Sequence, residues 1–328
     1  MSRCIVPSHL TGARLNTQMM TMDQTRSNHP SRTGVRSDSP GERSPVELDF
    51  SSLTACVPPE GWVERCNEAG IRFDDGDVEK LGMYLAILMY TNTRMNLTAI
   101  RDEVEAWDKH IFDALTLVPV LSEIDEGASI VDIGSGGGLP GVPLAIVMPS
   151  MWFTLVDATK KKIDYLDQVI DTLGLKNVRA INARAEQLGT DRGERTPAGR
   201  VGAHREHYDV VLARGVGQIA MLAELTVPLL KIGGLVLMTK GQRAEDELEE
   251  AKQALYMLHA GHAGTIETPT GRIVVIEKQR KTPRDYPRRD GEPKRSPLGV
   301  KKAGKTGLKT GVKKGSEKAD EKKSRDPE

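Results

Sequence analysis

Hydrophobic residues change spacing repeatedly over residues 129–278 of the chain. Short apolar runs typical of strands occur at residues 129–133, 152–157, 178–182, 208–213, 234–239 and 272–278. Between these runs the apolar positions follow the period of a helix, at residues 141–148, 160–173, 218–230 and 243–258. Alternation of strand and helix predicts an α/β fold, in which a mostly parallel sheet carries helices on both faces.

A helical segment is expected before the first strand. Val78, Leu81, Leu85 and Leu88 fall on one face of a helix, and Asp74 or Asp75 is placed to cap its start. A second helix is expected around residues 107–117. The helical segment spans residues 56–127.

Charge is spread unevenly along the chain, although 46 Lys and Arg balance 46 Asp and Glu. Residues 281–328 hold 16 basic and 8 acidic side chains and few large apolar ones, a composition that does not bury enough surface to order a chain. The first 49 residues contain no aromatic side chain. We therefore expect a disordered extension (1–55), the helical segment (56–127), an α/β domain (128–280) and a basic disordered tail (281–328).

Cysteine usage and hydropathy favour a cytoplasmic protein without a metal site. Cys4, Cys56 and Cys66 form no C-x-x-C pair and no Cys/His cluster, which argues against structural zinc and a disulfide framework. No apolar run approaches the roughly 20 residues that a membrane span needs. We expect no membrane partner and a monomer.

The most informative motif lies at residues 131–141 and reads VDIGSGGGLPG. An apolar strand ends in an acid and a glycine-dense turn, and a predicted helix follows. Glycines allow positive φ and let a ligand approach the main chain closely. The loop amides and the helix N-terminus then face that ligand.

Two cofactors compete for this loop. A dinucleotide site requires G-x-G-x-x-G directly after the strand. Counted from Gly134, the sixth position is Leu139 and the pattern fails; counted from Gly136 it fits, but begins well past the strand end. A D-x-G-x-G-x-G pattern fits directly at Asp132, Gly134, Gly136 and Gly138, and is typical of S-adenosylmethionine (SAM) methyltransferases, where the acid can take the SAM ammonium group.

Further candidate ligands follow the other strands, whose carboxyl ends meet at one edge of a parallel sheet. Asp157 ends the second strand and can accept two ribose hydroxyls, as it would in an NAD site as well. Ala185 and Glu186 are placed to meet an adenine ring, or simply to begin a helix. Arg214 can clamp the SAM carboxylate or an RNA phosphate, or pair with a neighbouring acid.

Catalytic residues are not identified by the sequence, although three candidates stand out. His110 and Asp113 lie three apart on one helix face, either as a dyad or as a packing pair. Lys240 closes the fifth strand and can hold a phosphate or stay solvated. Residues 160–162 are three lysines at a helix start, where the dipole disfavours cations, so a phosphate partner is a hypothesis beside solvated lysines.

With these residues in hand, the chain resembles the bacterial small-subunit ribosomal RNA guanine-N7 methyltransferases, also called the glucose-inhibited division protein B family. The resemblance runs from about Tyr84 to Leu298. It rests on residues 95–100, 110–115, 132–141, 183–186, 212–214, 228–234, 240–241, 286–289 and 297–298. The segment from Gly189 to Glu206 is longer than the family leads us to expect.

This resemblance implies a Rossmann-like class I SAM-dependent methyltransferase fold. It also implies SAM contacts at Gly134, Leu139, Ala185, Glu186 and Arg214, beside those argued for Asp132, Gly136 and Asp157. The expected reaction is methylation of N7 of one guanine in a loop of small-subunit (16S) ribosomal RNA, by in-line transfer without a general base. The alternatives are a SAM enzyme with a small-molecule or protein acceptor, and a non-catalytic ribosome assembly factor.

Overall fold

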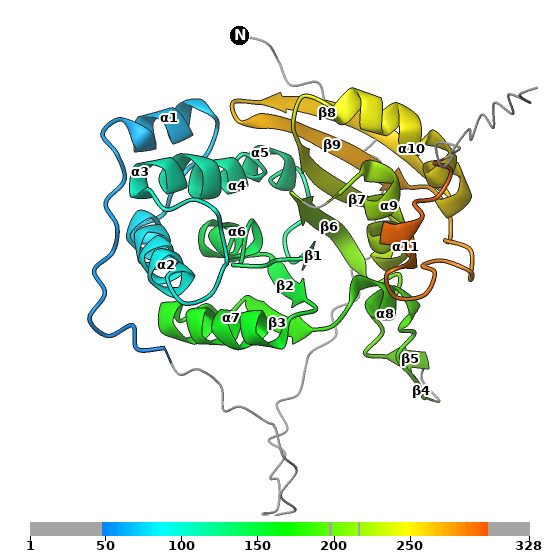
Figure 1. The fold of residues 1–328 in the computed structure, drawn as a ribbon, viewed down its shortest axis with the longest axis horizontal. Helices are drawn as coiled ribbons and strands as arrows, with labels where there is room; N and C mark the ends of the chain where they lie inside the picture. The colour runs from blue at the N-terminus through cyan, green and yellow to red at the C-terminus, as the bar shows by residue number, and fades with distance from the viewer. Residues whose placement is uncertain (1–47, 197–198, 216, 301–328) are drawn as a thin grey trace, which may run out of the picture.

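The structure is a computed structural model that describes residues 48–300 except 197, 198 and 216 (Figure 1). The expectations for residues 1–47 and 301–328 therefore lie outside the described residues. A seven-stranded sheet forms the centre, in the order β3-β2-β1-β6-β7-β9-β8. Its strands are β1 (Ser129–Ile133), β2 (Trp152–Asp157), β3 (Val178–Asn182), β6 (Tyr208–Arg214), β7 (Leu230–Lys240), β8 (Ala260–Thr268) and β9 (Gly271–Lys278).

The strand expectations are confirmed, with two additions. β3, β2, β1, β6 and β7 are parallel, whereas β9 runs antiparallel to β7 and β8 antiparallel to β9. Sequence periodicity did not predict β8, because most of its residues are only partly buried and no clean alternation marks them. It also did not predict the hairpin of β4 (Glu194–Thr196) and β5 (Gly199–Val201).

Helices cover both faces of the sheet (Figure 1). One face carries α2 (Asp77–Asn92), α6 (Gly141–Val147) and α7 (Lys160–Leu173), with α1 (Trp62–Glu68), α3 (Glu103–Ala106), η1 (Trp107–Phe112), α4 (Asp113–Leu115) and α5 (Val118–Leu121) around them. The other face carries α8 (Ala185–Thr190), α9 (Ile219–Thr226), η2 (Val227–Leu229), α10 (Ala244–Leu258) and α11 (Glu292–Arg295). None of the described helices is long and apolar enough to cross a membrane.

Alternation along β1 shows how one strand serves two cores. Ile130 joins the core beneath α2, α6 and α7, whereas Val131 and Ile133 join the core beneath α9 and α10. Side chains of a strand point to opposite faces in turn, so a strand covered on both sides is apolar throughout. Asp132 interrupts this apolar run and is buried nevertheless.

Two disorder boundaries and one helix cap predicted from the sequence are wrong. Residues 48–55 were expected in the disordered extension, yet Phe50 is buried and the Leu48 N–H donates to Gln168. The tail was expected to be disordered from residue 281, yet residues 281–300 pack against the domain, with Leu298 buried. Composition hides such packing because a few long-range contacts order an otherwise polar segment.

The cap of α2 also differs from the prediction. Gly76 occupies the N-cap position in a left-handed conformation and makes no side-chain cap hydrogen bond. Asp77, the first helical residue, turns back instead and accepts a hydrogen bond from the Asp74 N–H at 2.9 Å. The helix that follows still buries Leu81, Leu85 and Leu88, as their spacing predicts.

The sheet changes direction of growth at β1, because β2 and β3 lie on one side of this strand whereas β6 and β7 lie on the other. In open α/β sheets, ligands bind outside the carboxyl ends of the strands at such a switch point. The glycine loop leaves β1 at this point, and Asp157 and Arg214 end the flanking strands. The topology therefore brings the predicted cofactor ligands of β1, β2 and β6 to one edge.

Candidate functional site

The loop after β1 folds back onto the end of β2. The backbone N–H groups of Gly134 and Ser135 both donate to the Val156 carbonyl, at 2.8 and 3.0 Å. The Ser135 hydroxyl accepts from the Val156 N–H and donates to the Asp132 carbonyl. These bonds hold the turn rigidly across the carboxyl ends of two adjacent strands.

The glycines of this loop differ in whether neighbouring atoms leave room for a side chain. Gly138 has φ +100°, and a Cβ there would lie 2.7 Å from Val142 Cγ2, so sterics alone require glycine. Gly141 lies against Leu155, whose Cδ2 would be 2.2 Å from a Cβ. Gly136 has φ +57° but open space around it, with only the Gly134 carbonyl within 4 Å. Gly136 therefore borders room that the protein itself leaves unfilled, as a cofactor site requires.

Asp132 is buried with only half of its carboxylate satisfied. Its side chain is 1% exposed, and Oδ2 accepts from the Gly141 N–H, at the start of α6, at 3.1 Å. Oδ1 has no hydrogen-bond partner among the described residues. Burial raises the pKa of Asp132 to about 8. Because an unsatisfied buried oxygen is costly, a cationic or hydrogen-bonding ligand is expected beside it.

Asp157 is buried too, but both of its carboxylate oxygens have partners. Oδ2 accepts from the Gly136 N–H at 3.1 Å, and Oδ1 accepts from the Thr159 N–H at 2.8 Å. Lys162 Nζ lies 3.5 Å from Oδ2. A carboxylate offers about four lone-pair positions, so Asp157 keeps capacity for two hydroxyl groups of a ligand.

Arg214 forms the ion pair that the sequence left as an alternative. Its Nε lies 2.8 Å from Asp113 Oδ2, and both side chains are largely buried. A second guanidinium nitrogen donates to the Lys109 carbonyl. The structure thus joins two residues whose functions were predicted separately, and ties the helical segment to the end of β6. The planar guanidinium keeps further N–H donors for a ligand.

His110 and Asp113 do not form a dyad. His110 Nε2 lies 2.7 Å from the Thr98 hydroxyl, and Nδ1 lies 3.2 Å from the Lys109 carbonyl. Burial lowers the pKa of His110, and Arg214 lowers it further. The neutral ring therefore donates from Nδ1 and accepts from the Thr98 hydroxyl at Nε2, which leaves no free lone pair for a base.

His110 lies in the π-helix η1, and Asp113 begins α4 directly after it. Single π turns are frequent at functional sites, and the extra residue turns the following side chains to a new direction. Here His110 faces the loop at Thr98 while Asp113 faces Arg214. A spacing of three in the sequence suggested that His110 and Asp113 share one helix face. This prediction did not allow for a π turn, because hydrophobic periodicity gives no signal for one.

Ala185 and Glu186 are the first two residues of α8, which agrees with the alternative that they simply begin a helix. Both are buried, and Glu186 Oε1 accepts from the Gly291 N–H at 2.8 Å. The Glu186 carboxylate therefore contacts the segment after β9, whose packing the sequence did not predict. Leu139 is partly buried in the glycine loop, its N–H bonded to the Ser135 carbonyl.

Three of the four lysines considered as phosphate ligands have partners within the protein. Lys240 Nζ lies 2.9 Å from Glu247 Oε2 and also donates to the Gly217 carbonyl. Lys160 pairs with Asp164 on the next turn of α7, and Lys162 faces Asp157. Lys161 is exposed. The structure therefore favours local pairing for Lys160 and Lys240.

Two residues that support the site were missed. The Tyr84 hydroxyl donates to the Gly137 carbonyl at 2.9 Å, which fastens α2 to the glycine loop. The Asn92 side chain accepts from the N–H groups of Leu97 and Thr98 and donates to the Thr98 carbonyl, which fixes the turn that holds His110. A polar tip on the apolar face of a predicted helix was the available signal for Tyr84.

Comparison with known proteins gives a consistent result. A family described as "rRNA small subunit methyltransferase G" matches residues 77–271. A protein named "Ribosomal RNA small subunit methyltransferase G" from Sorangium cellulosum is 47% identical, over 76% of this chain and 99% of its own length. One of the same name from Leuconostoc citreum is 36% identical, over 73% of this chain and 98% of its own length.

Similarity to solved structures is weaker. A putative SAM-dependent methyltransferase from Methanococcus maripaludis gives a TM-score of 0.42 at 13% identity, covering 54% of this chain and 90% of its own. A putative methyltransferase from Escherichia coli gives 0.39 at 16% identity, covering 53% and 89%. These values carry no argument about function. The family match and the sequence identities, together with the site at the carboxyl edge, place this chain in the rRNA small subunit methyltransferase G family.

Proposed function

We propose that this protein transfers a methyl group from SAM to N7 of a specific guanine in a loop of small-subunit (16S) ribosomal RNA. Membership of the family supports the RNA substrate. The observation that carries the cofactor is Asp132 Oδ1, a buried oxygen without a partner beside a glycine loop that borders open space. Such an oxygen is suited to an ammonium group, which an amino-acid moiety supplies.

The residues present fit SAM at both ends. Asp132 would hold the ammonium group, and Arg214 has donors left for the carboxylate. Asp157 would accept the ribose hydroxyls, and Ala185 lies at the start of α8, where a backbone N–H can meet the adenine. The Gly134, Gly136 and Leu139 backbone would line the remaining wall. Glu186 Oε1 already accepts from the Gly291 N–H, so the carboxylate would contribute to the adenine site through its remaining lone pairs.

Methyl transfer to guanine N7 requires no proton removal, because N7 carries a free lone pair. SAM supplies an electrophilic methyl group on a sulfonium centre. The protein then contributes alignment, with the reacting atoms about 3–3.5 Å apart in line. This requirement agrees with the state of His110, Asp113 and Lys240, each of which is engaged by another protein group.

Access to N7 favours an unpaired target. In a paired RNA helix this atom lies in the deep, narrow major groove, which side chains do not reach. A guanine splayed out of a loop presents N7 directly to the edge of the sheet. Carbonyl or carboxylate oxygens near the base would stabilise the positive charge that develops on the product.

SAM binding is tested by calorimetry on two matched variants. Gly136→Asp places a carboxylate in the open space of the loop, and we expect the affinity for SAM to be lost. Gly127→Asp is the control, because Gly127 also has positive φ and nothing within 4 Å, but precedes β1 at the far edge of the sheet. Equal affinities in both variants would contradict the cofactor site.

The acceptor is tested by mass spectrometry of small-subunit RNA from cells with and without the protein. We expect one guanine to gain a methyl group at N7 and to lose it on deletion. Unchanged RNA, with SAM still bound, would favour a small-molecule or protein acceptor. RNA binding without any affinity for SAM would instead favour a non-catalytic assembly factor.

A further inference from the structure

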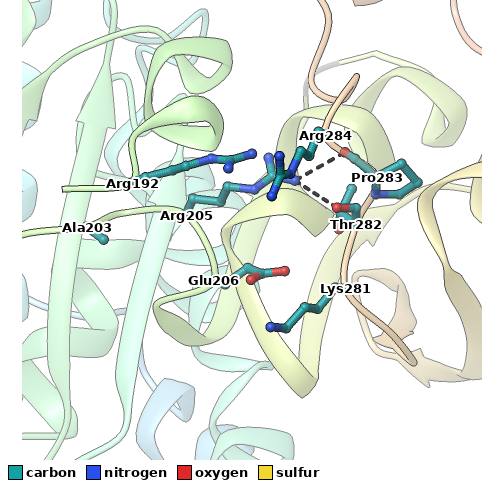
Figure 2. A pocket seen from close by; sticks show the side chains of 8 residues that line it. All are labelled: Arg192, Ala203, Arg205, Glu206, Lys281, Thr282, Pro283 and Arg284. Atoms are coloured by element: carbon teal, nitrogen blue, oxygen red, sulfur yellow. Dashed lines mark hydrogen bonds between the residues drawn. The ribbon is translucent and has the colours of Figure 1, made fainter. Parts of the chain in front are cut away.

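A basic cavity lies at the edge of the sheet opposite the cofactor loop. It has a volume of about 620 Å³ and is lined by Arg192, Ala203, Arg205, Glu206, Lys281, Thr282, Pro283 and Arg284 (Figure 2). Two segments far apart in the sequence form its walls, the approach to β6 and the chain after β9. Figure 2 shows the side chains of Arg192, Arg205 and Arg284 converging on one side of the cavity.

One wall comes from the segment that is longer than the family leads us to expect, Gly189 to Glu206. Its base is tightly built, because a Cβ on Gly193 would lie 2.2 Å from the Val201 carbonyl. Asp191 accepts from the Gly193 N–H through its side chain and from the Arg205 N–H through its carbonyl. Arg192 is therefore held at the cavity by a fixed turn.

The second wall is held by Arg205. Its buried guanidinium donates to four backbone carbonyls, those of Gly189, Thr282, Pro283 and Tyr286. No carboxylate within the described part of the chain forms an ion pair with it. Burial lowers the pKa of Arg205, Glu206 opposes this shift, and Arg192 adds a smaller lowering.

The balance of charge in the cavity is strongly positive. Four cationic side chains line it against one carboxylate, that of Glu206. Glu206 is in turn neutralised by the buried Lys278, whose Nζ lies 3.2 Å from Oε1. Lys281 and Arg284 are exposed and form no ion pair with the residues that the structure describes. Two exposed cations without an ion pair among the described residues, Lys281 and Arg284, favour an anionic ligand with several oxygens.

We propose that this cavity is a second RNA-binding site, which holds backbone phosphates of the small-subunit RNA on the side of the sheet remote from methyl transfer. The inference rests on the proposed function, because that function supplies the polyanion. Arg205 and Arg214 flank the two ends of β6, whose seven residues span roughly 20 Å. An RNA must therefore extend well beyond the target loop to occupy both sites.

Charge reversal at the exposed cations tests this site. The variant Lys281→Glu/Arg284→Glu leaves the carbonyl contacts of Arg205 in place. The control Lys80→Glu/Lys176→Glu makes the same change of charge at exposed lysines of α2 and of the turn before β3. We expect the first variant to lose about tenfold in affinity for protein-free small-subunit RNA and to flatten the salt dependence by about one unit of slope per lost phosphate contact.

Three further measurements separate the outcomes. Affinity for SAM and the unfolding temperature should match those of the unchanged protein. Affinity for an oligonucleotide that contains only the target loop should also stay unchanged, because this RNA does not reach the cavity. The full-length protein is used throughout.

Equal losses in the test and control variants, or an equal loss for the short oligonucleotide, would overturn the proposal. Loss of affinity for the assembled subunit alone, with protein-free RNA bound normally, would assign the cavity to a ribosomal protein and overturn it too. Failure of the unchanged protein to methylate RNA would instead count against the proposed function.

Discussion

Two deeply buried ionisable side chains, one at each edge of the sheet, differ in how their hydrogen bonds are satisfied. At the carboxyl edge, Asp132 is 1% exposed and one of its carboxylate oxygens has no partner among the described residues. At the amino edge, Lys278 is 0% exposed, and its ammonium group donates to Glu206 and to the Leu230 carbonyl. Burial opposes the charge in both, raising the pKa of Asp132 and lowering that of Lys278.

The difference separates a structural ion from a proposed cofactor ligand. Lys278 completes its bonding within the protein, so it stabilises the junction of β6, β7 and β9 without any ligand. Asp132 leaves bonding capacity unused at the edge where ligands of α/β sheets bind. A fold tolerates such a group where a ligand later compensates its cost.

Asp132→Asn is the strongest test of this contrast. Asparagine keeps a carbonyl oxygen for the Gly141 N–H but removes the negative charge. We expect the affinity for SAM at pH 8 to fall by about 10- to 100-fold, since a hydrogen bond to a charged group contributes about 1.5–3 kcal/mol. Unchanged affinity by calorimetry would assign Asp132 to the fold alone.

The pH dependence sharpens the same test. The pKa of Asp132 rises from 3.8 to about 8 in the ligand-free protein, so between these values the unfolded chain has lost a proton that the folded protein keeps. The stability from Asp132 is present below about pH 4 and is lost as the pH rises to about 8. Affinity for SAM should rise over the same window, by at most about tenfold per pH unit.

The variant Asp132→Asn supplies the control for both pH profiles. We expect it to lack this component of the dependence, in chemical denaturation and in calorimetry alike. The same slope in the variant would attribute the dependence to another group.

Lys278→Met tests the opposite edge. Methionine fills a similar volume but leaves the Leu230 carbonyl and Glu206 without the ammonium group. We expect the free energy of unfolding to fall by about 2 kcal/mol, while the affinity for SAM stays unchanged. A loss of SAM affinity as large as that of Asp132→Asn would abolish the distinction between the edges.

The ion pair of Arg214 and Asp113 gives a smaller effect on stability, measured by a double-mutant cycle with Arg214→Ala and Asp113→Asn. We expect a coupling of about 1–2 kcal/mol in the free energy of unfolding. Methylation should suffer more in Arg214→Ala than in Asp113→Asn, because Arg214 is the proposed ligand and Asp113 only positions it. Equal losses of activity would limit Arg214 to holding the helical segment on β6.

Two fully buried tyrosines provide the smallest contrast. Tyr84 donates to the Gly137 carbonyl, whereas the Tyr165 hydroxyl has no hydrogen-bond partner among the described residues. We expect Tyr84→Phe to cost about 1 kcal/mol in the free energy of unfolding, and Tyr165→Phe to cost nothing or to stabilise slightly. Equal effects in urea denaturation would show that the bond to the glycine loop contributes little.

Much of the site was predictable because it follows from local sequence. Short apolar runs located the parallel strands and period-3.6 patterns the main helices, and parallel strands necessarily bring their ends to one edge. Asp132 was recognised through the glycine motif and Asp157 as a carboxylate that ends a strand, whereas Arg214 was recognised because an arginine at the end of an apolar strand is costly without a partner. The spacing of the glycines favoured a SAM loop over a dinucleotide loop.

Partners distant in the chain were not predictable in the same way. Arg214 lies 101 residues from Asp113, and Glu186 lies 105 residues from Gly291, so no local pattern links them. The order of residues 281–300 likewise depends on Arg288, whose guanidinium meets the fully buried Glu224. A composition rich in charge indicates disorder until such a buried counter-ion is known.

The amino-acid sequence by itself determined which polar residues follow each strand of this protein. These are an acid and a glycine turn at the first strand, and further polar residues at the ends of later strands. Only the tertiary structure decided which of these polar groups bond to one another and which one stays unsatisfied. The reason is physical, because hydrophobic periodicity depends only on residues that are neighbours in the sequence. Hydrogen-bond satisfaction, in contrast, depends on atoms that meet only after the chain has folded.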